Sequence, residues 1–346
     1  MVPLSKFPFN KVLKESNYSL FKPKKDECDQ CVAFKTGNLE KSIYDQHRKN
    51  IERSRLEKEN DVQKASEGKF ALFCMDVQAV KVVPKVNSGS QYYKTKLQVH
   101  NFTIYNIITH DSDNYIWDET EGDLTSSTFT TILICHIEQY LEKNPKQHHI
   151  ILYSDGCGYQ NRNVVLSNGL LNLAERKSIT IEQKYLVKGH TQMECDSTHA
   201  LIEKKIKCQT LDLPSDFVDQ VRKARINPKP LNVHHLYHEY FLNYDSKELQ
   251  RYKSIRPGKL IGDPTVNMLR CLKYSNDGQV WYKINLDEDF QMLPQRRSKI
   301  PLCLNKPHRV HTDRLVISKK KWTHLQQLKP SIHRDNHHFY DSIKYE

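Results

Sequence analysis

The sequence predicts an α/β protein with a mixed sheet, and three observations carry this prediction. Two apolar runs, KFALFCMDV at residues 69–77 and IILY at residues 150–153, lack polar alternation. Such runs are typical of central strands that are covered on both faces. An amphipathic helix is predicted between them at residues 126–143, with Ser126 or Ser127 as its cap. Both strands also lead to an aspartate, Asp76 or Asp155.

The order of the predicted elements restricts the possible α/β folds. Strands are expected at residues 69–77, 96–107, 114–117, 150–153 and 180–187, and helices at residues 126–143, 163–176 and 195–207. The first three strands would form an antiparallel meander, and the next helix would carry the chain over the sheet. The fourth strand would then lie parallel to the first. This β-β-β-α-β-α-β-α order is that of the ribonuclease H fold, a mixed five-stranded sheet with flanking helices.

The sequence predicts an accessory segment before this core and another after it. Residues 1–66 contain a CxxC motif and a highly charged helical arm at residues 39–64, and residues 67–211 form the core. Residues 212–346 are expected to form a small basic α+β module. A helix is predicted there at residues 233–244, followed by a hairpin at residues 270–286 that turns at Asn276-Asp277-Gly278.

Composition indicates an intracellular protein with a polyanionic partner. The 346 residues include 53 basic and 41 acidic side chains, which gives a net charge of +12. Nucleic acid is the first expectation, although a basic protein without such a partner has the same composition. Nine cysteines, mostly inside predicted elements, favour a reducing compartment. No signal sequence or membrane span is visible, so we expect a soluble, nuclear protein that does not bind membranes.

Asp76 and Asp155 are the principal candidates for catalysis. They are 155 − 76 = 79 residues apart, but the predicted fold would bring them side by side at neighbouring strand ends. Two close carboxylates repel each other unless a cation lies between them, so the pair predicts two Mg²⁺ or Mn²⁺ ions. No small-molecule cofactor is expected. The structural alternative is that these aspartates only form turns or cap helices.

A third carboxylate is expected near the helix at residues 195–207. Glu194, Asp196 and Glu203 lie there, and we favour Asp196 as the ligand, with Glu203 as the alternative. Asp196, His199 and Glu203 share one helical face. In the structural alternative, Asp196 caps the helix and Glu203 pairs with Lys207. His190 either assists proton transfer or product release, or serves only as a hydrogen-bonding loop residue.

Two further groups complete the candidate sites. Cys28, Cys31 and His47 have half the pattern of a zinc site, so either a ligand elsewhere completes it or no site exists. The basic C-terminal segment could follow a phosphate backbone, with an aromatic side chain stacking on bases. A solvated charged face is the alternative. The residues concerned are Arg309, Arg314, Lys319, Lys320, Lys321 and Trp322.

The motifs also resemble a known family. SDGCGYQNRN and GHTQMECDSTHALIE are the specific parts, with looser similarity in MDVQAV, YYKTKLQVHNFTIYNI, YIWDE and ISKKKWTHLQQL…HHFY. They resemble a transposon-derived family common in insects, otherwise uncharacterised, with a DDE-type, ribonuclease H-like core. The resemblance runs from Lys22 to Tyr340. It implies descent from a DNA transposase, with Asp76, Asp155 and Asp196 or Glu203 as the acidic triad.

The predicted function is therefore metal-dependent cleavage of DNA phosphodiester bonds and strand transfer, with DNA as the partner. The chain begins close to its CxxC motif, without the upstream DNA-recognition domain that many transposases carry. This favours a truncated copy or a domesticated protein. A catalytically inactive DNA- or chromatin-binding descendant, a ribonuclease H-like nuclease and a zinc-dependent protein-interaction module are the alternatives. Whether the chain forms a homo-oligomer is left open.

Overall fold

The computed structural model describes residues 6–16, 27–294 and 307–346. The predicted N-terminal segment (1–66) and C-terminal module (212–346) therefore lie partly outside the described residues. The chain divides into two compact units, Met1–Lys49 and Asn50–Glu346. The first unit contains α1 (Lys6–Glu15), α2 (Asp29–Lys35) and the beginning of α3 (Lys41–Ser66). Within it, the rings of Phe34 and Tyr44 stack with centroids 3.9 Å apart.

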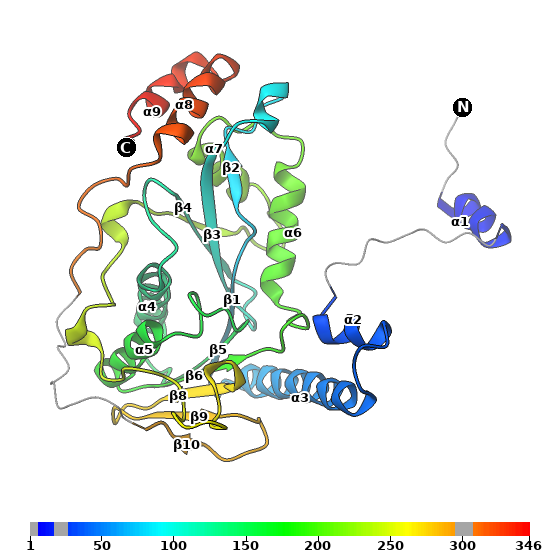
Figure 1. Ribbon diagram of the computed structural model, residues 1–346, viewed down its shortest axis with the longest axis vertical. Coiled ribbons are helices and arrows are strands. Elements are labelled where there is room, and N and C mark those ends of the chain that lie inside the picture. The colour runs from blue at the N-terminus through cyan, green and yellow to red at the C-terminus, as the bar shows by residue number, and fades with distance from the viewer. Residues whose placement is uncertain (1–5, 17–26, 295–306) are drawn as a thin grey trace. The chain divides into compact units, whose positions relative to one another are not determined.

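The second unit is built on one mixed sheet, so the predicted α/β class is confirmed (Figure 1). Among the described residues the sheet has ten strands. Nine of them lie in the order β10-β9-β8-β6-β5-β1-β3-β4-β7, and the tenth, β2, pairs with β3. Their bounds are β1 Ala71–Val77, β2 Lys81–Val83, β3 Leu97–Asn106, β4 Ser112–Asp118, β5 His149–Ser154, β6 Thr180–Tyr185, β7 Asn232–His235, β8 Cys271–Tyr274, β9 Val280–Lys283 and β10 Gln291–Met292.

The centre of this sheet follows the predicted connections. Strand β1 pairs antiparallel with β3, and β3 pairs antiparallel with β4. Helix α4 (Ser126–Lys143) then returns the chain to β5, which lies parallel to β1. The helix bounds are those predicted, but its N-cap is Thr125, one residue before the expected serines. Strand β6 continues the parallel pairing beside β5.

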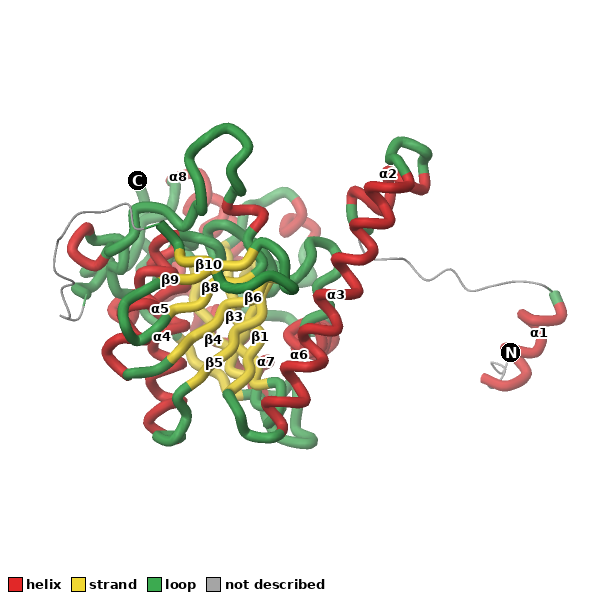
Figure 2. Tube along the Cα trace, turned by 90° about the horizontal axis from the view of Figure 1, so that it is seen from below, coloured by secondary structure: helices red, strands yellow, loops and turns green. Residues whose placement is uncertain are grey.

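Helices cover both faces of the central strands (Figures 1 and 2). Helices α4 and α5 (Val164–Lys177) pack against one face, where Phe73 of β1 and Leu152 of β5 are fully buried. On the other face, residues 50–66 of α3 and the start of α6 (Glu194–Ile206) cover Cys74 and Tyr153. This double coverage explains the unbroken apolar runs. The two faces alternate along β1, which determines where Asp76 is directed.

The structure differs from the predicted elements at two places. The helix expected at residues 233–244 is wrong, because the chain forms β7, which pairs parallel with β4, and then a short 3₁₀ turn, His238–Tyr240. Pairing with the open edge of β4 satisfies backbone groups that a separate helix would not reach. The polar stretch after residue 211 contains helix α7 (Pro214–Arg222), which the sequence analysis did not recognise. Pro214 is tolerated because it occupies the first helical turn.

The C-terminal segment extends the same sheet. Strands β8 and β9 form the predicted hairpin around Asn276-Asp277-Gly278, and β8 pairs antiparallel with β6. The proposed boundary at residues 211 and 212 therefore does not coincide with a break in the sheet. Helices α8 (Lys319–Leu328) and α9 (His337–Asp341) follow, and Leu325 of α8 and Tyr340 of α9 belong to a second core cluster with Ile202 and Phe217. No helix within the described ranges is long and apolar enough to cross a membrane.

Candidate functional site

Strand β1 directs Asp76 toward α6. Successive side chains of a strand point to opposite faces, and Leu72, Cys74 and Asp76 share one parity. Leu72 and Cys74 are buried in the cluster that includes the start of α6, whereas Phe73 faces α4 and α5. In register, Asp76 pairs with Thr103 of β3. The carboxylate therefore lies near the end of a central strand, on the face that α6 covers.

Helix α6 supplies two further polar side chains to this place. Asp196 is in its first turn, and His199 lies one turn later on the same helical face. One possible ligand atom from each of Asp76, Asp196 and His199 lies within 4.8 Å of the other two. The two aspartates are 196 − 76 = 120 residues apart in sequence. Two carboxylates and an imidazole at this spacing are a suitable ligand set for a divalent cation.

Buried hydrogen bonds determine the tautomer of His199. Asn114 donates its side-chain Nδ2 protons to the backbone oxygens of Ser112 and Asn232, so its Oδ1 acts as an acceptor. The hydroxyl of Thr103 donates its only proton to that Oδ1, at 3.0 Å. It must therefore accept the bond from Nε2 of His199, also at 3.0 Å. In a neutral ring this bond places the proton on Nε2 and the lone pair on Nδ1, which is the tautomer that coordination through Nδ1 requires.

Asp155 lies at the end of the neighbouring strand, as predicted. The β1–β5 pairing runs to Cys74 and Tyr153, so Asp76 and Asp155 each come two residues after the last paired position. Oδ1 of Asp155 accepts bonds from the Cys157 N–H at 3.0 Å and from Asn161 Nδ2 at 2.8 Å. These bonds hold the carboxylate in a turn. Within the described residues, Asp155 belongs to no group of three ligands as close as that of Asp76.

The other acidic candidates on α6 have cationic partners. Glu203 forms an ion pair with Lys81 and accepts a bond from Gln78 at 3.0 Å, so the expected partner Lys207 is replaced by Lys81. Glu194 pairs with Lys58 at 2.7 Å. Asp196 also accepts a bond from the Met193 N–H at 3.2 Å, so it caps the helix while lying beside Asp76. Of these three acids, the geometry favours Asp196 as a metal ligand.

The histidine that lies beside Asp76 and Asp196 is His199, not His190. His190 lies in the turn between β6 and α6, where its backbone N–H donates to the Val187 carbonyl at 2.9 Å. His199 is the residue that meets the two aspartates, and sequence analysis did not select it as a ligand. The sequence could have indicated His199 as a third ligand through its spacing of three residues from Asp196, because residues three apart share a helical face.

The first unit brings together the three predicted zinc ligands. Cys28 precedes α2, Cys31 lies within it, and His47 is in the first part of α3. Nε2 of His47 is 3.4 Å from Sγ of Cys28 and 3.6 Å from Sγ of Cys31. Partial burial raises the pKa of the Cys31 thiol, and the neighbouring Cys28 raises it further. The arrangement is compatible with a bound metal ion.

Several predicted nucleic-acid contacts have internal partners. Arg314 pairs with buried Glu121 at 2.5 Å, and Lys321 pairs with Glu119 at 2.6 Å. Trp322 stacks on Tyr345, with ring centroids 4.3 Å apart. The exposed cations that remain from this predicted set are Arg309, Lys319 and Lys320.

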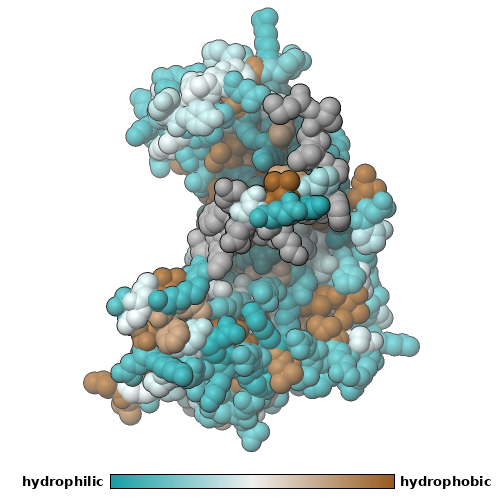
Figure 3. All heavy atoms as spheres, turned by 90° about the vertical axis from the view of Figure 1, so that its right-hand side faces the viewer, coloured by the Kyte–Doolittle hydropathy of each residue, from teal (hydrophilic) through white to brown (hydrophobic). Residues whose placement is uncertain are grey.

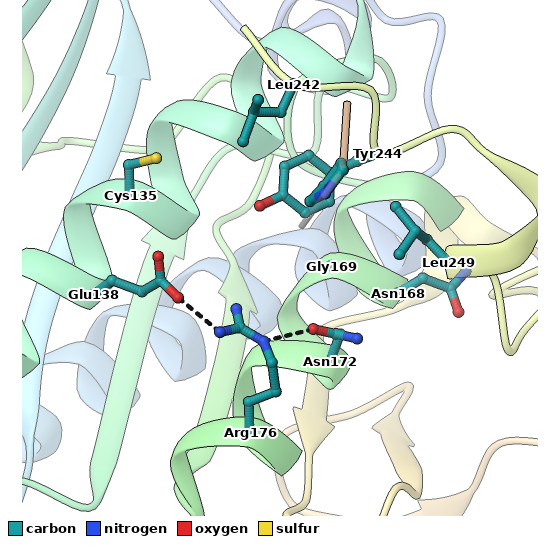
Figure 4. A pocket seen from close by; sticks show the side chains of 10 residues that line it. Cys135, Glu138, Asn168, Gly169, Asn172, Arg176, Leu242, Tyr244 and Leu249 are labelled. Carbon is teal, nitrogen blue, oxygen red and sulfur yellow. Dashed lines mark hydrogen bonds and ion pairs between the residues drawn. The ribbon is translucent and has the colours of Figure 1, made fainter. Parts of the chain in front are cut away.

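A separate small cavity of about 100 Å³ lies between α4 and α5 (Figure 4). Arg176 crosses its floor, paired with Glu138 at 2.9 Å and donating to Asn172 at 2.8 Å. None of the predicted site residues lines this cavity. Because its charged groups already neutralise each other, it offers less to an ionic ligand than the acidic group near β1 and α6.

Comparison with known proteins adds no assignment. A search against protein-family models found no match to this chain, and a search of curated proteins found none either.

Proposed function

We propose that this protein is a transposase-derived, metal-dependent nuclease of DDE type, which cleaves DNA phosphodiester bonds and transfers strands. The observation that carries the proposal is the group formed by Asp76, Asp196 and His199, whose ligand atoms lie within 4.8 Å of one another. In this proposal Asp76 and Asp196 bind the metal, Nδ1 of His199 completes the set, and Asp155 binds a second ion from the neighbouring strand end.

The order of the central strands supports a ribonuclease H-like core. Three antiparallel strands, a crossover helix, and two further strands parallel to the first are the connections that such a core requires. In open sheets of this kind, ligands bind beyond the ends of the central strands, where connections diverge. Asp76 and Asp155 come from the two strands at that place. The five additional strands, β2 and β7–β10, would then be elaborations of this core.

The chemistry follows from the ligand set. A divalent ion held by carboxylates keeps positions for water and phosphate oxygens, so it can activate a water or a 3′-hydroxyl and stabilise the leaving oxygen. Carboxylates bind both Mg²⁺ and Mn²⁺, but the transition metal Mn²⁺ accepts an imidazole ligand more readily than the harder ion Mg²⁺. We therefore expect Mn²⁺ to support more cleavage than Mg²⁺ at equal concentration.

A nicking assay on supercoiled plasmid tests the proposal. The full chain is incubated with Mg²⁺ or Mn²⁺, and the Asp76→Asn, Asp155→Asn and Asp196→Asn variants are compared with wild type. Loss of one metal ligand should reduce the rate by at least about 100-fold, which corresponds to about 2.7 kcal/mol of transition-state stabilisation. Each variant retains the shape of the side chain, and circular dichroism verifies that it folds.

Asp219→Asn is the matched control. It removes an acid that pairs with Arg222 on α7 and does not belong to the acidic group, so cleavage should remain within about threefold of wild type at saturating DNA. Equal cutting by wild type and Asp196→Asn would eliminate the catalytic assignment. Binding of DNA without cutting would indicate the inactive DNA-binding alternative. A preference for RNA–DNA hybrid would indicate a ribonuclease H-like nuclease.

We also propose that Cys28, Cys31 and His47 bind a structural zinc ion. With Zn–S near 2.3 Å and Zn–N near 2.05 Å, a tetrahedral ion requires a sulfur–nitrogen separation of about 3.6 Å. The two observed separations, 3.4 and 3.6 Å, are close to this value. Purified protein should contain about one zinc per chain, and Cys28→Ser should lose it, as measured by mass spectrometry of metals. X-ray absorption would identify the fourth ligand; absence of zinc from wild type would contradict the site.

A further inference from the structure

A lysine-rich groove of about 810 Å³ lies along the C-terminal half of α6, β2 and the short 3₁₀ turn Gly89–Tyr92. Its charged lining consists of six lysines and one acid, which leaves a formal surplus of 6 − 1 = +5. These residues are Lys81, Lys85, Lys94, Lys96, Lys204, Lys207 and Glu203. They come from three separate parts of the chain, so the sequence shows no continuous charge run there.

Three of the lysines have internal partners that shape the groove. Lys81 pairs with Glu203, Lys85 bonds to the carbonyls of Ile206 and Lys207, and Lys94 bonds to Gln327. The side-chain ammonium groups of the other three, Lys96, Lys204 and Lys207, have no hydrogen-bond or ion-pair partner among the described residues. Burial lowers the pKa of Lys96, so its ammonium is partly dehydrated without a compensating acid. An anion in the groove would supply that compensation.

The groove also contains an aromatic side chain suited to stacking. Tyr92 lines it and is 82% exposed, and its neighbour Tyr93 is 85% exposed. A cationic groove combined with exposed aromatic rings is the usual arrangement for binding unpaired nucleic-acid strands. Figure 3 shows one face of the molecule, mostly hydrophilic, with hydrophobic residues in small separate groups.

The position of the groove connects it to the acidic group. Glu203, at its edge, is seven residues after Asp196 on the same helix, or about 10 Å along the helix axis. Val80 and Lys81, which line the groove, follow Asp76 by only a few residues. A strand in the groove would thus reach the acidic group within a few nucleotides.

We infer that this groove binds the phosphate backbone of an unpaired DNA strand beside the site of cleavage, with a base stacked on Tyr92. The inference rests on the proposed function, because it assigns the substrate of the same site. Lys96, Lys204 and Lys207 contact phosphates, and Tyr92 supplies the stacking that distinguishes an unpaired strand from a duplex.

Fluorescence anisotropy in EDTA tests the inference without requiring cleavage. The probes are a labelled 30-nucleotide single strand and the corresponding duplex. The triple variant Lys96→Gln/Lys204→Gln/Lys207→Gln should bind the single strand at least about tenfold more weakly at 100 mM KCl. The slope of log K against log[salt] should fall by about 2, from three contacts at about 0.7 each. Tyr92→Ala should weaken single-strand binding about fivefold or more and leave duplex binding unchanged.

The matched control is Lys143→Gln/Lys146→Gln/Lys177→Gln, which removes the same charge from exposed lysines outside the groove. Its affinity and salt slope should remain those of wild type. Equal losses in both triple variants would overturn the inference, because overall charge would then explain binding. So would an effect confined to duplex, or failure of wild type to bind either probe.

The two proposals fail separately. If wild type does not cut plasmid but the groove variants lose single-strand binding, the groove assignment stands and the catalytic one falls. If wild type cuts plasmid and the groove variants bind the single strand normally, the catalytic assignment stands and the groove assignment falls.

Discussion

Thr103 is the residue through which the sheet controls the histidine of the acidic group. It is fully buried on β3, it pairs in register with Asp76, and its hydroxyl joins Asn114 to His199. In the proposed metal site, a partner of this kind would orient His199 and fix its tautomer without touching the metal. Thr103 would then be a positioning residue.

Replacing Thr103 by valine should preserve the shape of the side chain and remove both hydrogen bonds. We expect metal affinity, measured by titration with Mn²⁺, to fall by about tenfold or more. The free energy of unfolding should fall by about 1–3 kcal/mol, because buried polar groups lose a partner. Thr103→Ser retains the hydroxyl and should recover most of the metal affinity. Equal affinity in the valine variant would exclude the positioning role.

At the scale of elements, a buried charge group attaches α3 to the sheet. Lys184 of β6 contacts Glu57 and Asp61 of α3, each at 2.6 Å, and Tyr153 donates to Asp61 at 2.7 Å. Burial alone would lower the pKa of Lys184, but the charges and hydrogen bonds of Asp61 and Glu57 together outweigh burial and raise the pKa above the ordinary value. This explains how a highly charged helix packs against an apolar sheet.

Removing one partner from this group should be costly. Asp61→Asn leaves Lys184 with Glu57 alone, and we expect a loss of about 3 kcal/mol in the free energy of unfolding, measured with urea. The double variant Asp61→Leu/Lys184→Met should recover part of that loss, because no buried charge remains unpaired. Asp219→Asn is the control, since its pair with Arg222 is half exposed and should contribute less than about 1 kcal/mol. Similar losses in both single variants would contradict this account.

For the molecule as a whole, two buried histidines contribute to how stability depends on pH. Burial, with a smaller contribution from Lys321, lowers the pKa of His100 to about 4. Burial also lowers the pKa of His136 to about 4, partly opposed by Asp113. In the unfolded chain both would titrate near 6.5. Their stabilising contribution is therefore complete above that value and is lost as the pH falls toward 4.

Urea unfolding at pH 7.5 and pH 5.0 should reveal this loss. Linkage predicts that each histidine contributes about 2 kcal/mol less at pH 5.0, or about 4 kcal/mol together. His136→Gln cannot take up the proton, so the difference between the two pH values should shrink by about 2 kcal/mol. His333→Gln changes an exposed histidine and should leave the difference unaltered. A pH-independent free energy of unfolding in wild type would refute the assignment.

Elements that depend on local interactions could be predicted from the sequence, whereas those that depend on distant partners could not. Helix 126–143 and the hairpin around Asn276-Asp277-Gly278 were predicted closely, because periodicity and turn chemistry are local. The segment at residues 233–244 was misread, because its pairing partner β4 is more than 100 residues away. For the same reason Glu203 remained an alternative to Asp196 until the structure paired it with Lys81.

By itself, the sequence determined the α/β class, the positions of the central strands and the delivery of aspartates to two neighbouring strand ends. These properties depend on patterns within a single element. Only the tertiary structure decided which charged groups neutralise one another. Arg314 and Lys321 have acidic partners, whereas Lys96, Lys204 and Lys207 have none among the described residues. Electrostatic energy depends on distance in space, and residues far apart in the chain become neighbours only when it folds.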